Sequence, residues 1–342
     1  KVNAADYTVL ANRKSSTGPI ADPENKREIV TAYVSDENGA RVKTGKNITL
    51  VLSVGPQIPI SSPFQYQRSK GNVWVDYSLT IVQTKSGQVW DTSTGKIMPM
   101  IDQFDLTGKY TFSDKLTMSY ATFTPKVKKD KAPLIIWLHG GGEGGTDPTV
   151  PLLGNKAANY AAEGIQSIFE GAYVLSPQCP GAWMHNTQGV GTQGKDNDIY
   201  NEGLMALIKD YVKANPGIDV NRIYVGGCSN GGYMALKLIL LYPDYFAAGY
   251  ISALAYRSEY ISDSDIQKIK NVPIWFVHAK DDRTTIPDLT VVPVFDRLRK
   301  AGAKNVHFTY YDNVIDITNF YGGKGYQYNG HWSWVYLHEN LP

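Results

Sequence analysis

Apolar and polar residues alternate along the first part of the chain with the two-residue period of β-strands. The clearest example is residues 73–81, where every second position is apolar: Val73, Val75, Tyr77, Leu79 and Ile81. Such alternation is typical of a strand with one buried face. Further strand-like runs at 28–34, 48–54 and 109–112 are separated by turn residues, with no helical pattern between them. The sequence therefore predicts an all-β sandwich for residues 1–115.

From residue 116 onward the pattern changes to strands that alternate with helices. One helix carries five apolar residues on a single face: Leu204, Leu207, Ile208, Tyr211 and Val212. Predicted strands separate the helical stretches at 133–139, 171–177, 222–228, 246–251, 272–278 and 305–311. This alternation indicates a mostly parallel sheet wrapped by helices in residues 116–342. The short 252–271 stretch leaves no room for a large lid.

A glycine-rich turn follows the predicted strand at 222–228. Residues 226–232 read Gly-Gly-Cys-Ser-Asn-Gly-Gly, which contains G-x-S-x-G between a strand and a helix. In this context the motif is a nucleophile elbow, in which Ser229 occupies a sharp turn that glycines on both sides make room for. The alternative is a plain glycine-rich connection between the two elements. We expect Ser229 to be a nucleophile.

An elbow serine needs a base and an orienting acid, which follow it in the order acid, then histidine. The strand at 272–278 leads directly to Asp281 and Asp282, and we favour Asp282 as the acid. The other interpretation of this pair is a cap for the helix that follows. His331 lies on a glycine-preceded loop near the C-terminus and is the preferred base, with His338 as the competitor within the last helix.

The apolar strand at 133–138 leads into His139-Gly140-Gly141-Gly142, the pattern of an oxyanion loop. Backbone N–H groups must approach a developing alkoxide closely, and side chains there would obstruct them. We expect the N–H groups of Gly141 (or Gly142) and Asn230 to form the oxyanion hole. Neither a P-loop nor a dinucleotide-binding glycine pattern is completed here.

On these motifs the chain resembles the α/β-hydrolase superfamily, and within it the esterases related to prolyl-oligopeptidase-type and polyhydroxybutyrate-depolymerase-type hydrolases. The matching stretches lie at 133–143, 174–180, 227–232, 277–282 and 330–334. The resemblance covers about residues 116–342, and it implies a serine hydrolase; the strands and turns before it indicate an Ig-like β-sandwich. One departure, an extra residue between Asp282 and Pro287, leaves the choice between the two aspartates open.

Composition narrows the partners. The formal net charge is +2 and there is no run of basic residues, which argues against nucleic acid. No apolar stretch is long enough for a membrane span. The low charged fraction (19%) and the 23 tyrosines lean towards a secreted, mature protein. In that setting a disulfide between Cys179 and Cys228 competes with two buried thiols. No metal-ligand spacing is present, and no cofactor is expected.

The sequence thus predicts a serine carboxylesterase with the triad Ser229, Asp282 and His331. Its partner would be a small-molecule or polymeric ester, and the β-domain offers a surface for homo-oligomer formation. Candidate pocket residues are Trp183, His185 and Trp332, each of which would serve equally well in packing. The alternatives are a prolyl-oligopeptidase-like peptidase and a non-catalytic surface- or carbohydrate-binding protein. The acyl and alcohol specificity is left open.

Overall fold

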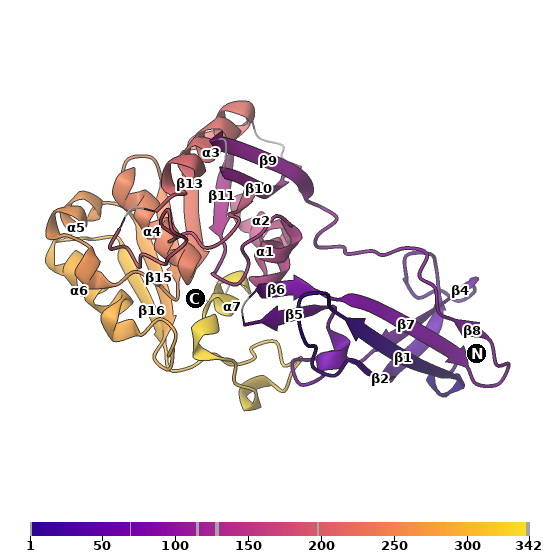
Figure 1. Cartoon of the computed structure of the whole chain (residues 1–342). Coiled ribbons are helices and arrows are strands. Elements are labelled where there is room, and N and C mark those ends of the chain that lie inside the picture. Colours follow the sequence, from indigo (N-terminus) through magenta and orange to yellow (C-terminus); the bar gives the residue numbers. More distant parts are fainter. Residues whose placement is uncertain (1, 69, 114–115, 127–129, 197, 340–342) are drawn as a thin grey trace. The chain divides into compact units, whose positions relative to one another are not determined.

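The chain divides into two compact units, with the division between Ile97 and Met98 (Figure 1). The computed structural model describes residues 2–68, 70–113, 116–126, 130–196 and 198–339. The two units are described separately below.

The first unit is built from strands and two short 3₁₀ turns, η1 (Ala4–Asp6) and η2 (Pro59–Ser61). The strands are β1 (Tyr7–Lys14), β2 (Glu24–Arg27), β3 (Ile29–Ser35), β4 (Asn47–Leu52), β5 (Phe64–Gln67), β6 (Gly71–Trp74), β7 (Asp76–Gln83) and β8 (Val89–Trp90). They form an antiparallel sheet in the order β2-β1-β7-β8 and two ribbons, β3-β4 and β5-β6. This all-β unit is Ig-like, as the sequence predicted.

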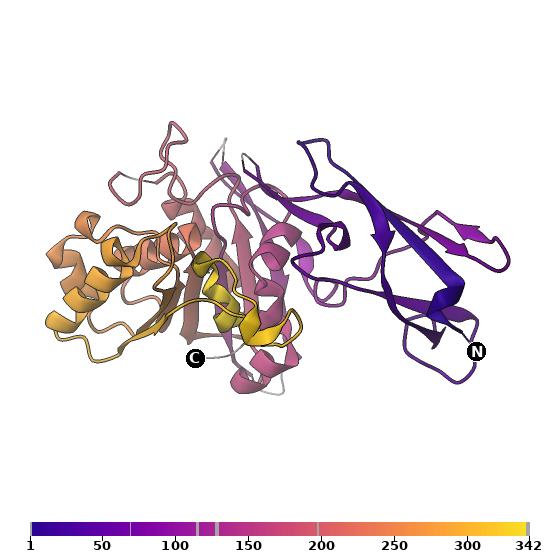
Figure 2. The same cartoon turned by 90° about the horizontal axis from the view of Figure 1, so that it is seen from below.

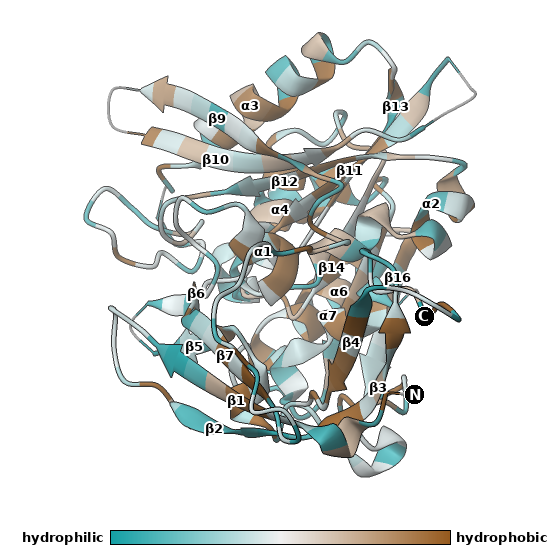
Figure 3. Cartoon of the chain, turned by 90° about the vertical axis from the view of Figure 1, so that its right-hand side faces the viewer, coloured by the Kyte–Doolittle hydropathy of each residue, from teal (hydrophilic) through white to brown (hydrophobic). Residues whose placement is uncertain are grey.

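Alternation along β1 explains how the first unit builds its core. Tyr7, Val9 and Ala11 are buried, and the positions between them are more exposed. The predicted 73–81 strand is interrupted, because buried Val75 separates β6 from β7. Figure 3 shows β2 and β5 as hydrophilic and β4 as hydrophobic, so the apolar signal is concentrated in a few strands.

The second unit is centred on an eight-stranded sheet in the order β16-β15-β14-β13-β11-β12-β10-β9. The strands are β9 (Asp105–Ser113), β10 (Leu116–Phe123), β11 (Ala132–Leu138), β12 (Tyr173–Gln178), β13 (Ile218–Cys228), β14 (Ala248–Ser252), β15 (Ile274–Ala279) and β16 (Val306–Tyr311). β9 and β10 are antiparallel, and the remaining six strands are parallel to one another. The sheet has the mostly parallel order expected for an α/β-hydrolase.

The start of the second unit differs from the boundary drawn from the sequence at residue 115. Strand β9 (Asp105–Ser113) pairs with β10 along the edge of the large sheet, so it belongs to the second unit. Residues 114 and 115 themselves lie outside the described part of the chain. Alternation shows that a segment is a strand, but it does not show which sheet the strand joins.

Helices cover both faces of the large sheet (Figure 1, Figure 2). The helices are α1 (Thr149–Gly154), α2 (Glu163–Phe169), α3 (Asn201–Ala214), α4 (Asn230–Leu241), α5 (Asp263–Ile269), α6 (Val291–Lys300) and α7 (Trp334–His338). Short 3₁₀ turns complete the unit: η3 (Ala157–Ala161), η4 (Ser258–Tyr260), η5 (Pro287–Leu289), η6 (Gly323–Gly325) and η7 (Gly330–Trp332). Among the described residues, no helix is both long enough and apolar enough to span a membrane.

Two hydrophobic clusters lie on opposite sides of this sheet. Leu134 and Ile136 of β11 pack in one cluster with residues of α3 to α6, whereas Ile135 and Trp137 pack in the other with residues of α1, α2 and α7. Neighbouring residues of a strand point to opposite faces, and both faces of β11 are therefore buried. The central strand β11 is consequently apolar and fully buried, and the segments that follow the parallel strands carry most of the polar groups of the site.

Candidate active site

Ser229 occupies the turn between β13 and α4, as the elbow motif predicts. Its backbone has φ 55° and ψ −116°, a conformation that side-chain-bearing residues rarely adopt. The Ser229 N–H donates to the carbonyl of Ser252 on the neighbouring strand β14 at 2.9 Å, and its own carbonyl accepts from Tyr233 N–H at 2.9 Å. These two bonds, one to the neighbouring strand β14 and one to helix α4, hold the serine in a strained backbone conformation.

The two motif glycines are required by close backbone packing. A Cβ atom on Gly231 would lie 1.9 Å from the carbonyl oxygen of Leu138, and one on Gly227 would lie 2.5 Å from the Gly231 backbone. Real Cβ atoms essentially never come so close to backbone atoms. The elbow therefore packs directly on the end of β11, where the predicted oxyanion loop begins.

The predicted base and acid are hydrogen-bonded to each other. His331 Nδ1 lies 2.8 Å from Asp282 Oδ2, and the side chains of both residues are largely buried. Asp282 follows β15, and His331 lies in η7 beyond β16. Because β13, β14, β15 and β16 are parallel neighbours, the segments after them emerge at the same edge as Ser229. Among the described residues, no hydrogen bond is present at the Ser229 hydroxyl.

The Asp282 carboxylate accepts five hydrogen bonds. Oδ1 accepts the N–H groups of Thr284 (2.8 Å) and Thr285 (3.0 Å). Oδ2 accepts from the Thr285 hydroxyl (2.7 Å), from His331 Nδ1 (2.8 Å) and from His278 Nε2 (3.0 Å). Burial acts to raise the pKa of Asp282, but the bonds from His278, His331 and Thr285 outweigh it and lower the pKa. The carboxylate is therefore held in its charged, acceptor-only form.

His278 and Thr285 are parts of this network that the sequence analysis did not assign. His278 Nε2 also lies 2.9 Å from the carbonyl oxygen of Thr285, so Nε2 must carry a proton. No partner is described for His278 Nδ1. The signal in the sequence was the spacing of His278 and Thr285 around Asp282, but spacing alone does not give side-chain directions.

The competing residues lie elsewhere. Asp281 accepts a hydrogen bond from Gln327 at 2.9 Å and makes no described contact with His331. His338 is buried against Trp137 and Tyr160, with ring centroids 4.6 and 5.0 Å away. Burial lowers the pKa of His338 to about 3, and the nearby Lys156 acts in the same direction. His338 is therefore a neutral core residue in this structure.

The two predicted oxyanion donors lie on different segments, Gly141 on the loop after β11 and Asn230 at the start of α4. Gly140 N–H donates to the Asn155 side chain at 3.1 Å, so that group is already used. No hydrogen bond is described for Gly141 N–H. Asn230 is the first residue of α4, where N–H groups lack partners within the helix. The donors predicted from the sequence, Gly141 and Asn230, thus border the elbow with their N–H groups unused by the described residues.

A buried histidine fixes the shape of the oxyanion loop. His139 Nδ1 lies 2.6 Å from the Gly140 carbonyl oxygen, and His139 Nε2 accepts the N–H of Cys179 at 3.2 Å. These contacts require the tautomer protonated at Nδ1. Burial lowers the pKa of His139 to about 4, although the bond to Gly140 opposes the shift. A neutral His139 therefore connects the loop to the end of β12.

The three candidate pocket residues have different environments. Trp183 is completely buried: its indole N–H donates to the His139 carbonyl at 3.0 Å, and its backbone N–H donates to Asn230 Oδ1 at 2.5 Å. Trp183 therefore packs against the loop after β11, which favours the packing alternative that the sequence left open. His185 is half-buried on the segment after β12, and Trp332 is 43% exposed beside the base.

Comparison with known proteins identifies both units. Residues 1–96 match the family described as the esterase Ig-like N-terminal domain, and residues 121–314, more than half of the chain, match the phospholipase/carboxylesterase family. This chain belongs to the phospholipase/carboxylesterase family. Membership places it among carboxylic ester hydrolases.

Individual relatives agree with this family. A solved structure of a thermostable esterase is 25% identical, covers 99% of this chain and 88% of its own, and has a TM-score of 0.76. Feruloyl esterase B of Neurospora crassa is 32% identical over 129 residues, which span 37% of this chain and only 41% of that protein. A ferulic acid esterase structure, at 17% identity and TM-score 0.50 over 70% of this chain and 95% of its own, shows the fold alone.

The two cysteines of this carboxylesterase-family chain are free. Cys179 follows β12 and Cys228 ends β13, and strand β11 lies between those two strands. Two strand spacings amount to about 9.6 Å, beyond the Cα separation that a disulfide spans. The residues also pack in the clusters on opposite faces of the sheet. The disulfide considered from the sequence is therefore not formed.

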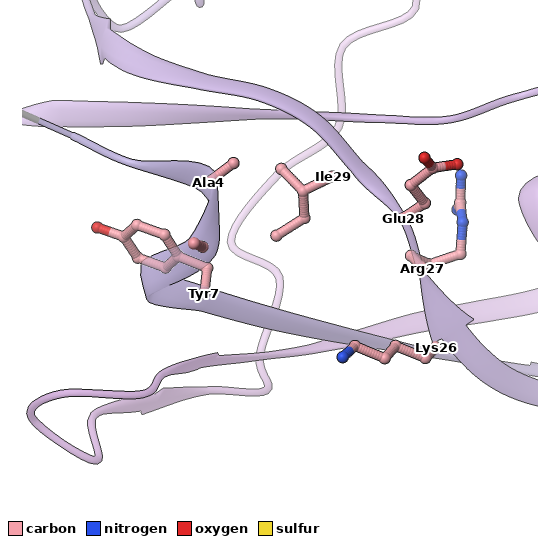
Figure 4. A pocket seen from close by; sticks show the side chains of 7 residues that line it. Ala4, Tyr7, Lys26, Arg27, Glu28 and Ile29 are labelled. Atoms are coloured by element: carbon pink, nitrogen blue, oxygen red, sulfur yellow. The ribbon is translucent and has the colours of Figure 1, made fainter.

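The first unit contains a separate surface hollow of about 440 Å³. It is lined by Ala4, Ala5, Tyr7, Lys26, Arg27, Glu28 and Ile29 (Figure 4). Apolar side chains line one part of it and charged side chains line another. None of the site residues predicted from the sequence lies there.

Proposed function

We propose that the chain hydrolyses carboxylic esters through an acyl-enzyme intermediate formed on Ser229. The observation that carries this proposal is the buried hydrogen bond between His331 Nδ1 and Asp282 Oδ2, close in the sheet to a serine in an elbow conformation. This is the geometry of an orienting acid and a base, with the nucleophile on the same edge of the sheet.

In the proposed reaction, Ser229 Oγ attacks the ester carbonyl carbon while His331 Nε2 accepts the hydroxyl proton. The C–O bond to the alcohol then breaks, and the proton on Nε2 passes to the leaving alkoxide. Water attacks the acyl-enzyme in the second half, again giving its proton to His331, and the carboxylic acid leaves as Ser229 is reprotonated. No oxidant, reductant or cofactor enters this balance.

Asp282 has the task of holding His331 in the reactive tautomer. Its Oδ2 accepts the Nδ1 proton, which leaves Nε2 unprotonated to receive the serine proton. We assign His278 and Thr285 as positioning residues, because both donate to the same Oδ2 and keep it charged and correctly placed. The charge of Asp282 then stabilises the imidazolium formed during attack.

The N–H groups of Gly141 and Asn230 would bind the negative oxygen of the tetrahedral intermediate. Gly141 has no side chain to obstruct the approach, and the rings of His139 and Trp183 support its loop from beneath. Prearranged donors of this kind contribute about 3 to 4 kcal/mol each in comparable enzymes.

Aromatic acyl esters are the first substrates to test. Two relatives are named as feruloyl or ferulic acid esterases, although one match covers 41% of its partner and the other shows the fold alone. Feruloyl methyl ester and p-nitrophenyl acetate together would separate an aromatic-acyl preference from general esterase activity.

The decisive experiment is labelling with a fluorophosphonate probe in parallel with p-nitrophenyl acetate hydrolysis. The wild-type protein should react at a single serine, and Ser229→Ala should lose the label and reduce kcat on the order of 10⁴–10⁶-fold. The unchanged melting temperature of the variant is the control for folding. Retained hydrolysis in Ser229→Ala would disprove the mechanism, and cleavage of peptides in preference to esters would favour the peptidase alternative.

A further inference from the structure

Five aromatic side chains form a connected series on the segment 320–332, which contains the proposed base His331. The ring centroids are 5.1 Å apart for Phe320–Tyr321, 6.4 Å for Tyr321–Tyr326, 4.9 Å for Tyr326–Tyr328 and 6.1 Å for Tyr328–Trp332. Phe320 is 65% exposed, Tyr321 38% and Trp332 43%, while Tyr326 and Tyr328 are half-buried. We call this set the aromatic strip. Contiguous exposed rings of this kind mark interaction sites.

The loop that carries the outer rings is held by one buried carboxylate. Asp316 Oδ2 accepts the N–H groups of Tyr321 (2.7 Å) and Gly323 (3.0 Å), and Oδ1 accepts the N–H of Thr318 (2.9 Å). Asp316 N–H in turn donates to the Tyr326 carbonyl at 3.0 Å. The rings therefore stand on a backbone with a defined conformation, which reduces the entropy lost on binding a ligand.

The strip is continuous with the candidate active site. Trp332 directly follows His331, and Gln327, between two ring-bearing residues, donates to Asp281 beside the acid. A Cβ atom on Gly330 would lie 2.2 Å from Asp281 Oδ1, so the base loop packs closely on the acid loop. A ligand lying along the rings would thus end at the residues that would attack it.

The chemistry of the strip matches a sugar better than a hydrocarbon chain. Three of its five rings are tyrosines, whose hydroxyls can exchange hydrogen bonds with sugar hydroxyls while the ring faces contact C–H groups. Burial raises the pKa of Tyr328 to about 12, so its hydroxyl stays protonated at neutral pH. The neighbouring Gln327 and Asn329 are exposed amides, which add polar partners.

We propose that the aromatic strip binds the carbohydrate part of an ester substrate, so that the enzyme acts on acyl groups attached to a polysaccharide. The inference rests on the ester hydrolysis proposed above, since it names the substrate class of the same site. The sugar chain would stack on the outer rings, and its acyl group would lie at Ser229 and His331.

The test removes the outer rings, which are not part of the catalytic machinery. Phe320→Ala and Tyr321→Ala are assayed on p-nitrophenyl acetate, p-nitrophenyl decanoate and acetylated xylan. Trp90→Ala, which removes an exposed aromatic ring of the first unit (46% exposed), is the matched control. Each strip variant should lose about 3- to 10-fold in kcat/KM on acetylated xylan, mainly through KM, and stay within about two-fold on p-nitrophenyl acetate. Tyr321→Phe keeps the ring and loses only the hydroxyl, so its loss on acetylated xylan should be smaller than that of Tyr321→Ala.

Binding is measured separately, by affinity electrophoresis in gels containing xylan, with every protein carrying Ser229→Ala. This assay needs no turnover, so it tests the strip even if wild-type protein hydrolyses no ester and the proposed function fails. The affinity of the strip variants for xylan, measured from their retardation in the gel, should fall by about the same 3- to 10-fold as kcat/KM on acetylated xylan. Unchanged binding and kinetics on xylan would overturn the proposal. An equal loss of kcat/KM on p-nitrophenyl acetate would also overturn it, because that result indicates a structural role of the rings. A loss confined to p-nitrophenyl decanoate would overturn it as well, because that result indicates a site for the acyl chain.

Discussion

The sharpest test of the site is the substitution Asp282→Asn. In the native protein Oδ1 accepts two backbone N–H groups, so an asparagine would keep its carbonyl oxygen there and place its NH₂ group at the Oδ2 position. That position faces three donors: the Thr285 hydroxyl, His278 Nε2 and His331 Nδ1. A donor would then meet three donors, and His331 would be driven to the tautomer protonated at Nε2.

The magnitude follows from these contacts. A base protonated at Nε2 cannot accept the serine proton, and loss of the correct tautomer costs on the order of 10⁴-fold in kcat, or about 5.5 kcal/mol. Stability should also fall by about 1 to 3 kcal/mol, because buried donors around Oδ2 lose their acceptor. Asp281→Asn is the matched control, because its Oδ2 accepts only a Gln327 hydrogen bond and it should cost little activity.

The assay is kcat/KM for p-nitrophenyl acetate between pH 5 and 9, together with urea unfolding of the same proteins. The pKa of folded Asp282 lies below its unfolded value of about 3.9, so its contribution to stability is complete above that value and is lost as pH falls through the folded pKa. The stability gap between wild type and Asp282→Asn should therefore narrow only in strong acid. Equal activity losses for Asp281→Asn and Asp282→Asn would refute the assignment of the acid.

Three further predictions follow from burial and close packing. His331→Ala should abolish activity as completely as loss of the nucleophile, whereas His338→Ala should reduce the melting temperature and keep most of kcat, and the reverse result would transfer the base assignment to His338. The two cysteines should resist thiol reagents in the folded protein, because burial raises the pKa of both thiols. Both should react with the same reagents after denaturation without a reductant. A denatured protein with no reactive thiol would contradict their free state. Gly231→Ala should destabilise the protein by at least about 3 kcal/mol or prevent folding, because its Cβ would lie 1.9 Å from the Leu138 carbonyl oxygen. Gly325→Ala is the control, because a Cβ atom there would meet open space and should be tolerated. Comparable unfolding curves for the two variants would contradict the close packing of the elbow.

The elements of the second unit were predictable because they depend on local hydrophobic patterns. The hydrogen bond between His331 and Asp282 was predictable because each residue follows a parallel strand of the same sheet. Buried parallel strands have nearly continuous apolar runs, and functional residues follow their ends. Once the strand order is that of an α/β-hydrolase, Ser229, Asp282 and His331 must emerge at one edge. The choice of Asp282 over Asp281 agrees with the hydrogen bond to His331, although the catalytic role itself stays a prediction.

Other features depend on which face or sheet a residue joins, and a single sequence does not give that. Strand β9 has the same alternation as the strands before it but pairs with β10. Cys179 and Cys228 both follow strand ends, yet β11 separates them. Trp183 had the composition of a pocket wall, and only the fold reveals that it is buried under the oxyanion loop. Export and oligomer formation through the first unit stay predictions.

The site contains two features that each cost free energy of folding, a buried charge and a strained backbone conformation. A charged carboxylate is buried, and a serine is held at φ 55°, each of which would be unfavourable alone. Five hydrogen bonds offset the burial of Asp282, and the packing of Gly227 and Gly231 against β11 maintains the Ser229 turn. Both compensations come from backbone groups and from side chains that are largely buried. The proposed catalytic geometry therefore rests on buried contacts at the ends of the parallel strands, whereas the proposed choice of substrate rests on exposed residues of the aromatic strip.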